Sequence, residues 1–175
     1  MNSSETGHTS FPRAGQMCGQ QSIRLLSPVY IRASASVAGK KEGEGPLGSL
    51  FDLTGDDDLF GCSTWEDAES SLQRDALHLA IQNAGLHSTD IRCLFAGDLL
   101  GQSIATSFGL MQYERPLFGL YGACSTCGLS LSLASMAVAG GFADRAACVT
   151  SSHFASAEKE FRFPLGYGNL SLIHI

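Results

Sequence analysis

The chain has 175 residues, of which 44% are hydrophobic and only 16% are charged. This length fits one ordinary domain or half of a larger protein, and this composition excludes an intrinsically disordered chain. The formal net charge of −6 argues against a protein that coats nucleic acid, because such proteins carry a surplus of basic residues.

The first part of the chain is predicted to be irregular. Residues 1–21 contain serine, threonine, glycine and isolated charges without periodicity and are predicted to form a disordered lead-in. Residues 29–31 are a candidate strand, and glycine, proline and charged residues predict a loop over 38–48. Residues 43–48 match the glycine spacing of a dinucleotide-binding turn, but Pro46 and the lack of a strand leading directly into them favour a plain loop.

The first clear helix is predicted to begin near Trp65. Ser63 and Glu66 have the spacing of a capping box, and Gly85 is a typical C-terminal stop. The helical stripe is predicted to consist of Ala68, Leu72, Ala76, Leu79, Ala80 and Asn83.

From residue 91 onward, strands and helices alternate. Apolar runs predict strands over residues 91–97, 116–121 and 145–151. Helices are predicted over 103–111 and 125–139, and the second is apolar on nearly all sides, so we expect it to be buried. Alternation of this kind indicates an α/β fold with a parallel or mixed sheet.

The end of the sequence predicts a truncated protein. Three parallel strands and one fully apolar helix need further layers to cover them, and residues 169–175 lack the polar finish usual for a terminus. We interpret these last residues as a truncated or non-native tail. We also expect the chain by itself to expose apolar surface and to associate.

Export and membrane insertion are not predicted. Residues 1–20 are polar and lack the apolar stretch of a secretory signal. The longest apolar region, residues 129–139, is interrupted by serines and is far shorter than the roughly 20 residues that a membrane-spanning helix needs. We therefore interpret the six cysteines as reduced thiols in the cytoplasm.

The carboxyl ends of the predicted strands carry the candidate site residues. Asp98, Cys124 and His153 each follow a different strand, and parallel strands bring such residues to one edge of the sheet, where ligands bind. Cys124 lies between a strand and a helix, where backbone N–H groups and the helix dipole stabilise a thiolate; a small buried cysteine is the plainer interpretation. His153 is either a base or donor for an anionic ligand or a loop histidine. Asp98 could orient a histidine or coordinate a cation, but a turn role is favoured.

Two cysteine patterns carry less weight. Cys124 and Cys127 have the spacing of a redox pair at a helix start, but the helix that follows is more apolar than an exposed redox helix. Cys124, Cys127, Cys148 and His153 contain the ligand types of a zinc site, but Cys148 falls in the middle of a predicted strand. We predict neither a metal site nor a bound cofactor.

Several separate segments resemble the stage V sporulation protein AD family. They are residues 45–51 (GPLGSLF), 96–100 (AGDLL), 118–126 (FGLYGACST), 150–153 (TSSH) and 157–164 (AEKEFRFP). They agree with the family in order and spacing over residues 29–168, and they cover only its N-terminal half.

The resemblance implies a thiolase-like fold, in which two similar halves stack in five layers. Residues 22–168 would form the N-terminal half, with the apolar helix after Cys124 buried at the centre. The implied function is to bind dipicolinic acid, free or as its calcium chelate, and to support its uptake into the developing spore. The implied partners are membrane proteins of the same sporulation operon, and the full-length protein could be a homodimer. The implied location is the cytoplasm or the surface of the spore inner membrane, without a nucleic-acid partner.

The resemblance also assigns roles to the candidate residues. Cys124 occupies the position of the thiolase nucleophile. A flat dianion could place one carboxylate on the backbone N–H groups of Ser125 and Thr126, with Ser152 or His153 near the other carboxylate. His153 comes too early to be a thiolase catalytic histidine, because those belong to the second half. Ligand binding is therefore favoured, and the alternatives are an acyltransferase that uses Cys124 as a covalent nucleophile and a non-catalytic structural partner.

Overall fold

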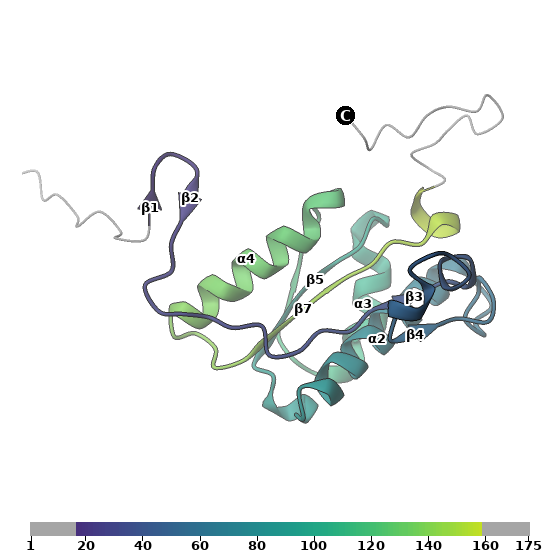
Figure 1. Ribbon diagram of the computed structural model, residues 1–175, viewed down its shortest axis with the longest axis horizontal. Helices are drawn as coiled ribbons and strands as arrows, with labels where there is room; N and C mark the ends of the chain where they lie inside the picture. The colour runs from purple at the N-terminus through teal and green to yellow at the C-terminus, as the bar shows by residue number, and fades with distance from the viewer. Residues whose placement is uncertain (1–16, 159–175) are drawn as a thin grey trace, which may run out of the picture.

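A three-stranded parallel sheet organises residues 17–158, the part of the chain that the computed structural model describes (Figure 1). β5 (Cys93–Gly97) lies between β6 (Leu117–Gly119) and β7 (Ala146–Thr150). Both pairings are parallel, with Phe95 opposite Phe118 on one side and Cys148 on the other. Parallel neighbours need crossover connections, and helices α3 (Ile104–Leu110) and α4 (Thr126–Ala139) provide them. The predicted α/β class with a parallel sheet is confirmed.

Alternate side chains of β5 pack against different helices. Leu94 and Ala96 belong to the core that contains Leu77 and Ile81 of α2 (Trp65–Asn83). The intervening residues Cys93 and Phe95 pack instead with residues of α4 (Thr126–Ala139). Figure 1 shows the strands between α4 on one side and α2 on the other. A strand covered on both faces is expected to be a continuous apolar run, which β5 is.

Helix α2 begins at Trp65, as predicted, but its N-cap lies one residue later than in the predicted capping box. The Oγ1 of Thr64 accepts a hydrogen bond from the backbone N–H of Asp67 at 3.1 Å, so Thr64, not Ser63, is the N-cap, and the predicted Ser63–Glu66 pair is wrong. The N–H donor still lies three positions after the cap, as cap geometry requires. Gly85, with φ of +65°, ends the helix as predicted, because glycine adopts this left-handed conformation without strain.

The buried face of α2 differs from the predicted stripe. Ala68 and Leu72 are buried as expected, but Ala76 is only half-buried and Asn83 is exposed. The buried face instead includes the polar residues Glu69, Ser71 and Gln73, with Leu77 and Ile81. Counting apolar residues alone misplaces the face, because polar side chains with hydrogen-bond partners can also be buried.

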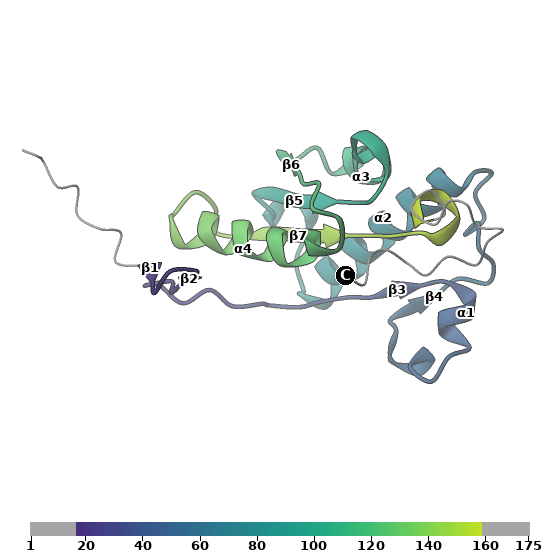
Figure 2. The same cartoon turned by 90° about the horizontal axis from the view of Figure 1, so that it is seen from above.

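The N-terminal region forms small separate elements. β1 (Met17–Cys18) pairs antiparallel with β2 (Ser22–Ile23). β3 (Val37–Ala38) pairs parallel with β4 (Leu53–Thr54), beside the short helix α1 (Lys40–Gly43). Figure 2 shows β3, β4 and α1 to one side of the three-stranded sheet.

Two predictions for this region need correction. Residues 29–31 form no strand, and Tyr30 and Ile31 are 80% and 76% exposed, because strand propensity without a pairing partner or a buried face does not suffice. The predicted loop over residues 38–48 contains the single helical turn α1. Of the predicted lead-in, residues 1–16 lie outside the described residues, as does the whole predicted tail, residues 169–175.

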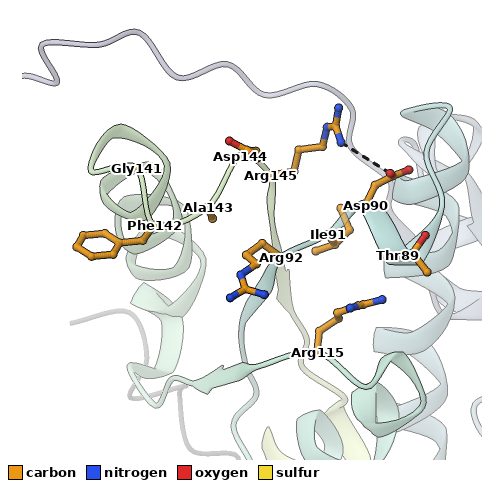
Figure 3. Close-up of a pocket in the computed structure, with 10 residues that line it drawn as sticks. All are labelled: Thr89, Asp90, Ile91, Arg92, Arg115, Gly141, Phe142, Ala143, Asp144 and Arg145. Atoms are coloured by element: carbon orange, nitrogen blue, oxygen red, sulfur yellow. Dashed lines mark ion pairs between the residues drawn. The ribbon is translucent and has the colours of Figure 1, made fainter.

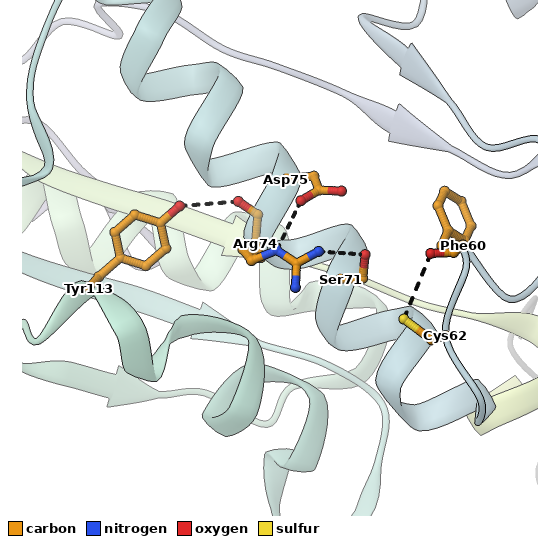
Figure 4. Close-up of polar contacts among 6 residues, drawn as sticks. All are labelled: Phe60, Cys62, Ser71, Arg74, Asp75 and Tyr113. Atoms are coloured by element: carbon orange, nitrogen blue, oxygen red, sulfur yellow. Dashed lines mark hydrogen bonds and ion pairs between the residues drawn. The ribbon is translucent and has the colours of Figure 1, made fainter.

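Helix α3 (Ile104–Leu110) packs closely on α2. A Cβ added at Gly109 would lie 2.5 Å from the carbonyl oxygen of Ser70, so only glycine permits this approach. After α3, the hydroxyl of Tyr113 donates a hydrogen bond to the carbonyl oxygen of Arg74 on α2 at 3.1 Å (Figure 4). The Arg74 side chain itself pairs with Asp75 at 3.1 Å.

Helix α4 is less buried than predicted. Only Thr126, Ser130 and Ala134 are buried along it, whereas Leu131 and Met136 are 41% and 40% exposed. The reason is that α4 packs on β5 and β7 while no described element covers its other side. Self-association through this face stays a prediction. Among residues 17–158, no helix is both long enough and apolar enough to cross a bilayer.

Gly97, the last residue of β5, gives a stability prediction. A Cβ at this position would lie 2.1 Å from the carbonyl oxygen of Leu120 and 2.8 Å from Cγ2 of Thr126, so the backbone after β6 or the start of α4 would have to move. We expect Gly97→Ala to lower the free energy of unfolding by about 1–3 kcal/mol, the usual cost of overpacking, measured by urea denaturation.

Gly119→Ala is the matched control. Gly119 lies on β6, and a Cβ added there meets no atom within 4 Å. It is expected to change the stability by no more than about 0.5 kcal/mol. Equal urea midpoints for the two variants would contradict the close contact at Gly97.

Candidate functional site

Cys124 lies in the turn that connects β6 to α4. The N–H of Leu120 still bonds to the carbonyl of Ala96 on β5 at 2.8 Å, and a 3-10 turn (Ala123–Ser125) follows before α4 begins at Thr126. Cys124 is a free thiol and is exposed. The turn therefore presents this thiol to solvent at the carboxyl edge of the sheet.

The backbone donors of this turn differ from the predicted ones. The N–H of Ser125 donates to the carbonyl of Gly122 at 3.0 Å, and the N–H of Thr126 donates to the carbonyl of Ala123. Both groups already have partners within the turn, and their contact with a carboxylate stays a prediction. Ligand contacts by the side chains of Ser125 and Thr126 stay a prediction.

The unused donors of the turn lie just upstream. Among residues 17–158, the N–H groups of Ala123 and Cys124 form no hydrogen bond, as is usual for the first N–H groups of a helical turn. Ala123 has φ of +47°, directly after Gly122 with φ of −123°. Consecutive φ angles of opposite sign direct neighbouring N–H groups into one anion-binding concavity. The N–H groups of this turn that are available to an anion are therefore those of Ala123 and Cys124.

Asp98 lies on the opposite face of β5 and is 1% exposed. Its Oδ1 accepts from the N–H of Leu100 at 2.8 Å, and its Oδ2 accepts from the N–H and the hydroxyl of Thr106 at 2.7 and 2.5 Å. The bond to Leu100 confirms the favoured turn role. The bonds to Thr106 add a second role, because they connect the end of β5 to α3. A role of Asp98 in ligand binding stays a prediction.

His153 follows β7 and packs against α2. Its Nδ1 accepts from the N–H of Ala155 at 3.1 Å, and its Nε2 lies 2.8 Å from the carbonyl oxygen of Asp58. Because Nδ1 accepts, the ring proton is assigned to Nε2, which donates to that carbonyl. The ring also lies against Trp65, with centroids 5.6 Å apart. Both ring nitrogens of His153 are therefore engaged in hydrogen bonds in this structure.

The predicted residues thus share one edge of the sheet but not one face. Cys124 leads into α4, whereas the contacts of Asp98 run to α3 and those of His153 run to α2 and the loop before it. Among the described residues, no hydrogen bond joins Cys124 to either side chain. Ser152 is exposed beside His153, and its contact with a ligand stays a prediction.

Two buried residues of α2 were missed by the sequence reasoning. Glu69 is 0% exposed and accepts hydrogen bonds from the hydroxyls of Ser151, at 2.7 Å, and of Ser156. Gln73 donates from Nε2 to Ser151 Oγ at 2.9 Å and to the carbonyl of Gly97 at 3.2 Å. Together they fasten the segment after β7 to α2. The available signal was a carboxylate and an amide four residues apart on the buried face of a helix.

The surroundings of Glu69 favour its protonated form. Burial raises the pKa of the Glu69 carboxyl above its ordinary value, and the negative charge of Asp98 acts in the same direction. The hydroxyls of Ser156 and Ser151 lower the pKa, but the net shift is upward.

The cysteines fall into two groups. Cys124 and Cys127 are exposed, whereas Cys93 is buried and Cys148 is half-buried. Burial raises the pKa of Cys93, and it raises the pKa of Cys148 to about 11. Across residues 17–158, no three histidine, cysteine, aspartate or glutamate side chains form a group that could hold a metal ion.

Comparison with known proteins gives consistent matches. A sequence model of the family described as Stage V sporulation protein AD matches residues 19–171. The curated Stage V sporulation protein AD of Bacillus subtilis (strain 168) is 41% identical over 153 residues, which cover 87% of this chain and 45% of that protein. The chain therefore spans about half the length of this relative.

Glu69 gives a pH prediction. Because its pKa is raised in the folded state, its contribution to stability is fully present below the pKa of the unfolded chain, ordinarily about 4.3, and is lost as the pH rises through the raised value. Glu69→Gln keeps hydrogen bonds to the two serines and removes the charge. We therefore expect the variant to gain stability relative to the wild type as the pH rises from about 4.5 to 8, measured by urea unfolding at each pH.

Glu66→Gln is the control, because Glu66 lies on the same helix and is partly exposed. Its stability should follow the wild type across this range. A constant difference between Glu69→Gln and the wild type at all pH values would contradict a protonation role for Glu69.

The cysteine environments predict an order of alkylation. At pH 8, a thiol with a pKa of about 11 is only about 0.1% thiolate, so Cys148 should react with iodoacetamide far more slowly than the exposed Cys124 and Cys127. Peptide mass spectrometry after timed labelling measures the rates. Unfolding in urea should remove the difference, and equal rates in the native protein would contradict the burial of Cys148.

Proposed function

The chain belongs to the stage V sporulation protein AD family, and we propose that it acts in sporulation by binding dipicolinic acid and supporting its uptake into the developing spore. We further propose that residues 22–168 form the N-terminal half of a thiolase-like scaffold. The parallel sheet, with helices on both faces and an apolar helix after Cys124, supports this assignment.

The observation that carries the proposal is the turn before α4. Dipicolinate is a flat ring with two carboxylates, and one of them can accept from the N–H groups of Ala123 and Cys124, which are unused among the described residues. α4 has 14 residues, so its N-terminus adds a favourable field for an anion. The second carboxylate, in the free acid or its calcium chelate, is proposed to reach Ser152 across the end of β5, or His153 once its ring gives up one of its two hydrogen bonds.

The exposed apolar surface supports a role in an assembly. Phe118 on the edge strand β6 is 51% exposed, and Leu131 on α4 is 41% exposed. Exposed sheet edges and apolar helix faces are typical of surfaces that pair with another chain. We propose that the full-length protein covers them, as a homodimer or with membrane proteins of its operon at the spore inner membrane.

An acyltransferase with Cys124 as nucleophile is the second candidate. Exposure of the thiol at a helix start favours it. Against it, both ring nitrogens of His153 are engaged in hydrogen bonds, so this imidazole would have to give up one of them to accept the proton of the thiol. A non-catalytic scaffold is the third candidate.

Calorimetry with dipicolinate tests the binding role. Cys124→Glu places a carboxylate beside the proposed anion donors, so we expect binding to weaken at least about tenfold, which is about 1.4 kcal/mol. Ser132→Glu adds the same charge to an exposed position further along α4 and should change the affinity by less than about twofold. Titrations with and without calcium compare the free acid with its chelate.

Cys124→Ala separates binding from catalysis. Because the proposed donors are backbone N–H groups, this variant should still bind dipicolinate. The acyltransferase candidate instead predicts an acyl adduct on the wild type, detected by intact mass after incubation with acyl thioesters and lost in Cys124→Ala. Absence of heat with dipicolinate for every form would refute the binding role, and absence of both signals would favour the scaffold.

A further inference from the structure

Three arginines surround the amino edge of the sheet, at the opposite ends of the strands from Cys124. Arg92 precedes β5, Arg115 precedes β6 and Arg145 precedes β7. The N–H of Arg92 donates to the carbonyl of Arg145 at 2.9 Å, which holds these two residues side by side. The N–H of Leu94 bonds to the carbonyl of Pro116, also at 2.9 Å, and this brings Arg115 to the same edge.

A hollow of about 270 Å³ opens between these residues. Figure 3 shows that the three arginines project from the starts of separate strands around this hollow. Asp90 lies beside Arg145, and Thr89 lies on the side toward which the Arg115 side chain extends. The turn that connects α4 to β7, which includes Phe142, forms a further wall.

The positive charge of this hollow is not neutralised within the described residues. Arg145 has a loose ion pair with Asp90, at 3.8 Å, and Asp144 also lines the hollow. Arg92 and Arg115 have no ion pair among residues 17–158. A local surplus of cations stands out in a chain whose net charge is −6.

Arg115 also has an unsatisfied donor. Its Nε is buried from solvent and finds no hydrogen-bond acceptor among the described residues. A buried donor without a partner typically costs about 1–3 kcal/mol, so a native site of this kind calls for an acceptor. Guanidinium groups offer two parallel N–H donors that fit the oxygens of a phosphoryl group.

We propose that this hollow binds a phosphoryl group, with Arg115 as its anchor, Arg92 as the second positive charge and the Thr89 hydroxyl as an additional donor. The five residues of β5, at about 3.3 Å each, separate it from the Cys124 turn by roughly 15 Å. The site is therefore distinct from the proposed dipicolinate site. A soluble phosphate and the phosphate of a lipid headgroup share this chemistry.

Arginine labelling of the 175-residue wild-type chain tests the site without any substitution. Phenylglyoxal modifies accessible arginines, and peptide mass spectrometry locates the products. Inorganic phosphate should slow the modification of Arg92 and Arg115 at least about threefold, whereas Arg74 on α2 should react at an unchanged rate. Sodium chloride at matched ionic strength controls for screening. Equal rates at Arg92 and Arg115 with and without phosphate would overturn the proposal.

Variants then measure the contribution of each residue. Calorimetry with inorganic phosphate should show at least about tenfold weaker binding in Arg115→Gln than in the wild type. Arg115→Lys should be intermediate, because it keeps the charge and loses the forked donors. Arg74→Gln is the control and should bind as the wild type does. Unchanged affinity in Arg115→Gln would overturn the proposal.

Vesicles distinguish the two sources of the phosphoryl group. The protein is sedimented with phosphatidylglycerol vesicles and, for comparison, with phosphatidylcholine vesicles. Sedimentation with the phosphatidylglycerol vesicles that is lost in Arg115→Gln indicates that the ligand is a lipid headgroup. Binding of inorganic phosphate without such sedimentation reports a soluble ligand. Both outcomes require that inorganic phosphate protects Arg92 and Arg115 from labelling, and without that protection the proposal is overturned.

Discussion

All five residues of β5 are buried, because α2 and α3 cover one face of the sheet while α4 covers the other. Such a strand offers no polar side chain along its length, so its polar contacts with a ligand are expected at its two ends. This constraint places the chemistry of residues 17–158 at the edges of the sheet. The carboxyl edge carries the Cys124 turn and the segment after β7, and the amino edge carries the arginines.

The carboxyl edge is itself divided by β5. On the α2 face, Glu69, Gln73 and Asp98 direct their polar atoms to Ser151, Ser156, Thr106 and nearby backbone, and these bonds join α2, α3 and β7 into one unit. On the α4 face, Gly97 allows the first turn of α4 to approach the strand, and that turn presents an exposed thiol and two unused N–H groups. One face therefore stabilises the fold, while the other remains available to a ligand.

The sequence predicts the edge of the candidate site better than its face. Element order was predictable because glycines such as Gly85 end apolar segments and because parallel strands align their carboxyl ends. Successive side chains of a strand point to opposite faces of the sheet. The face on which a site residue lies therefore depends on whether it stands at an odd or an even position along its strand, which is called its parity here. Asp98 has the parity of Leu94 and Ala96, which face α2, so its separation from Cys124 was implicit in β5. The availability of the Ser125 and Thr126 N–H groups was not, because it depends on the 3-10 turn before α4.

The outward face of α4 bears on the choice between binding and catalysis. A cysteine nucleophile needs a base close to its thiol, and His153, the imidazole predicted for this site, uses both nitrogens on the other side of the sheet. A base for Cys124 would have to come from a further chain segment packed on α4, where Leu131 and Met136 offer an apolar surface. Anion binding needs no such addition, since its donors are backbone groups of the turn itself. The proposed binding role therefore needs only groups among the described residues, whereas the acyltransferase candidate also needs a base from a further chain segment.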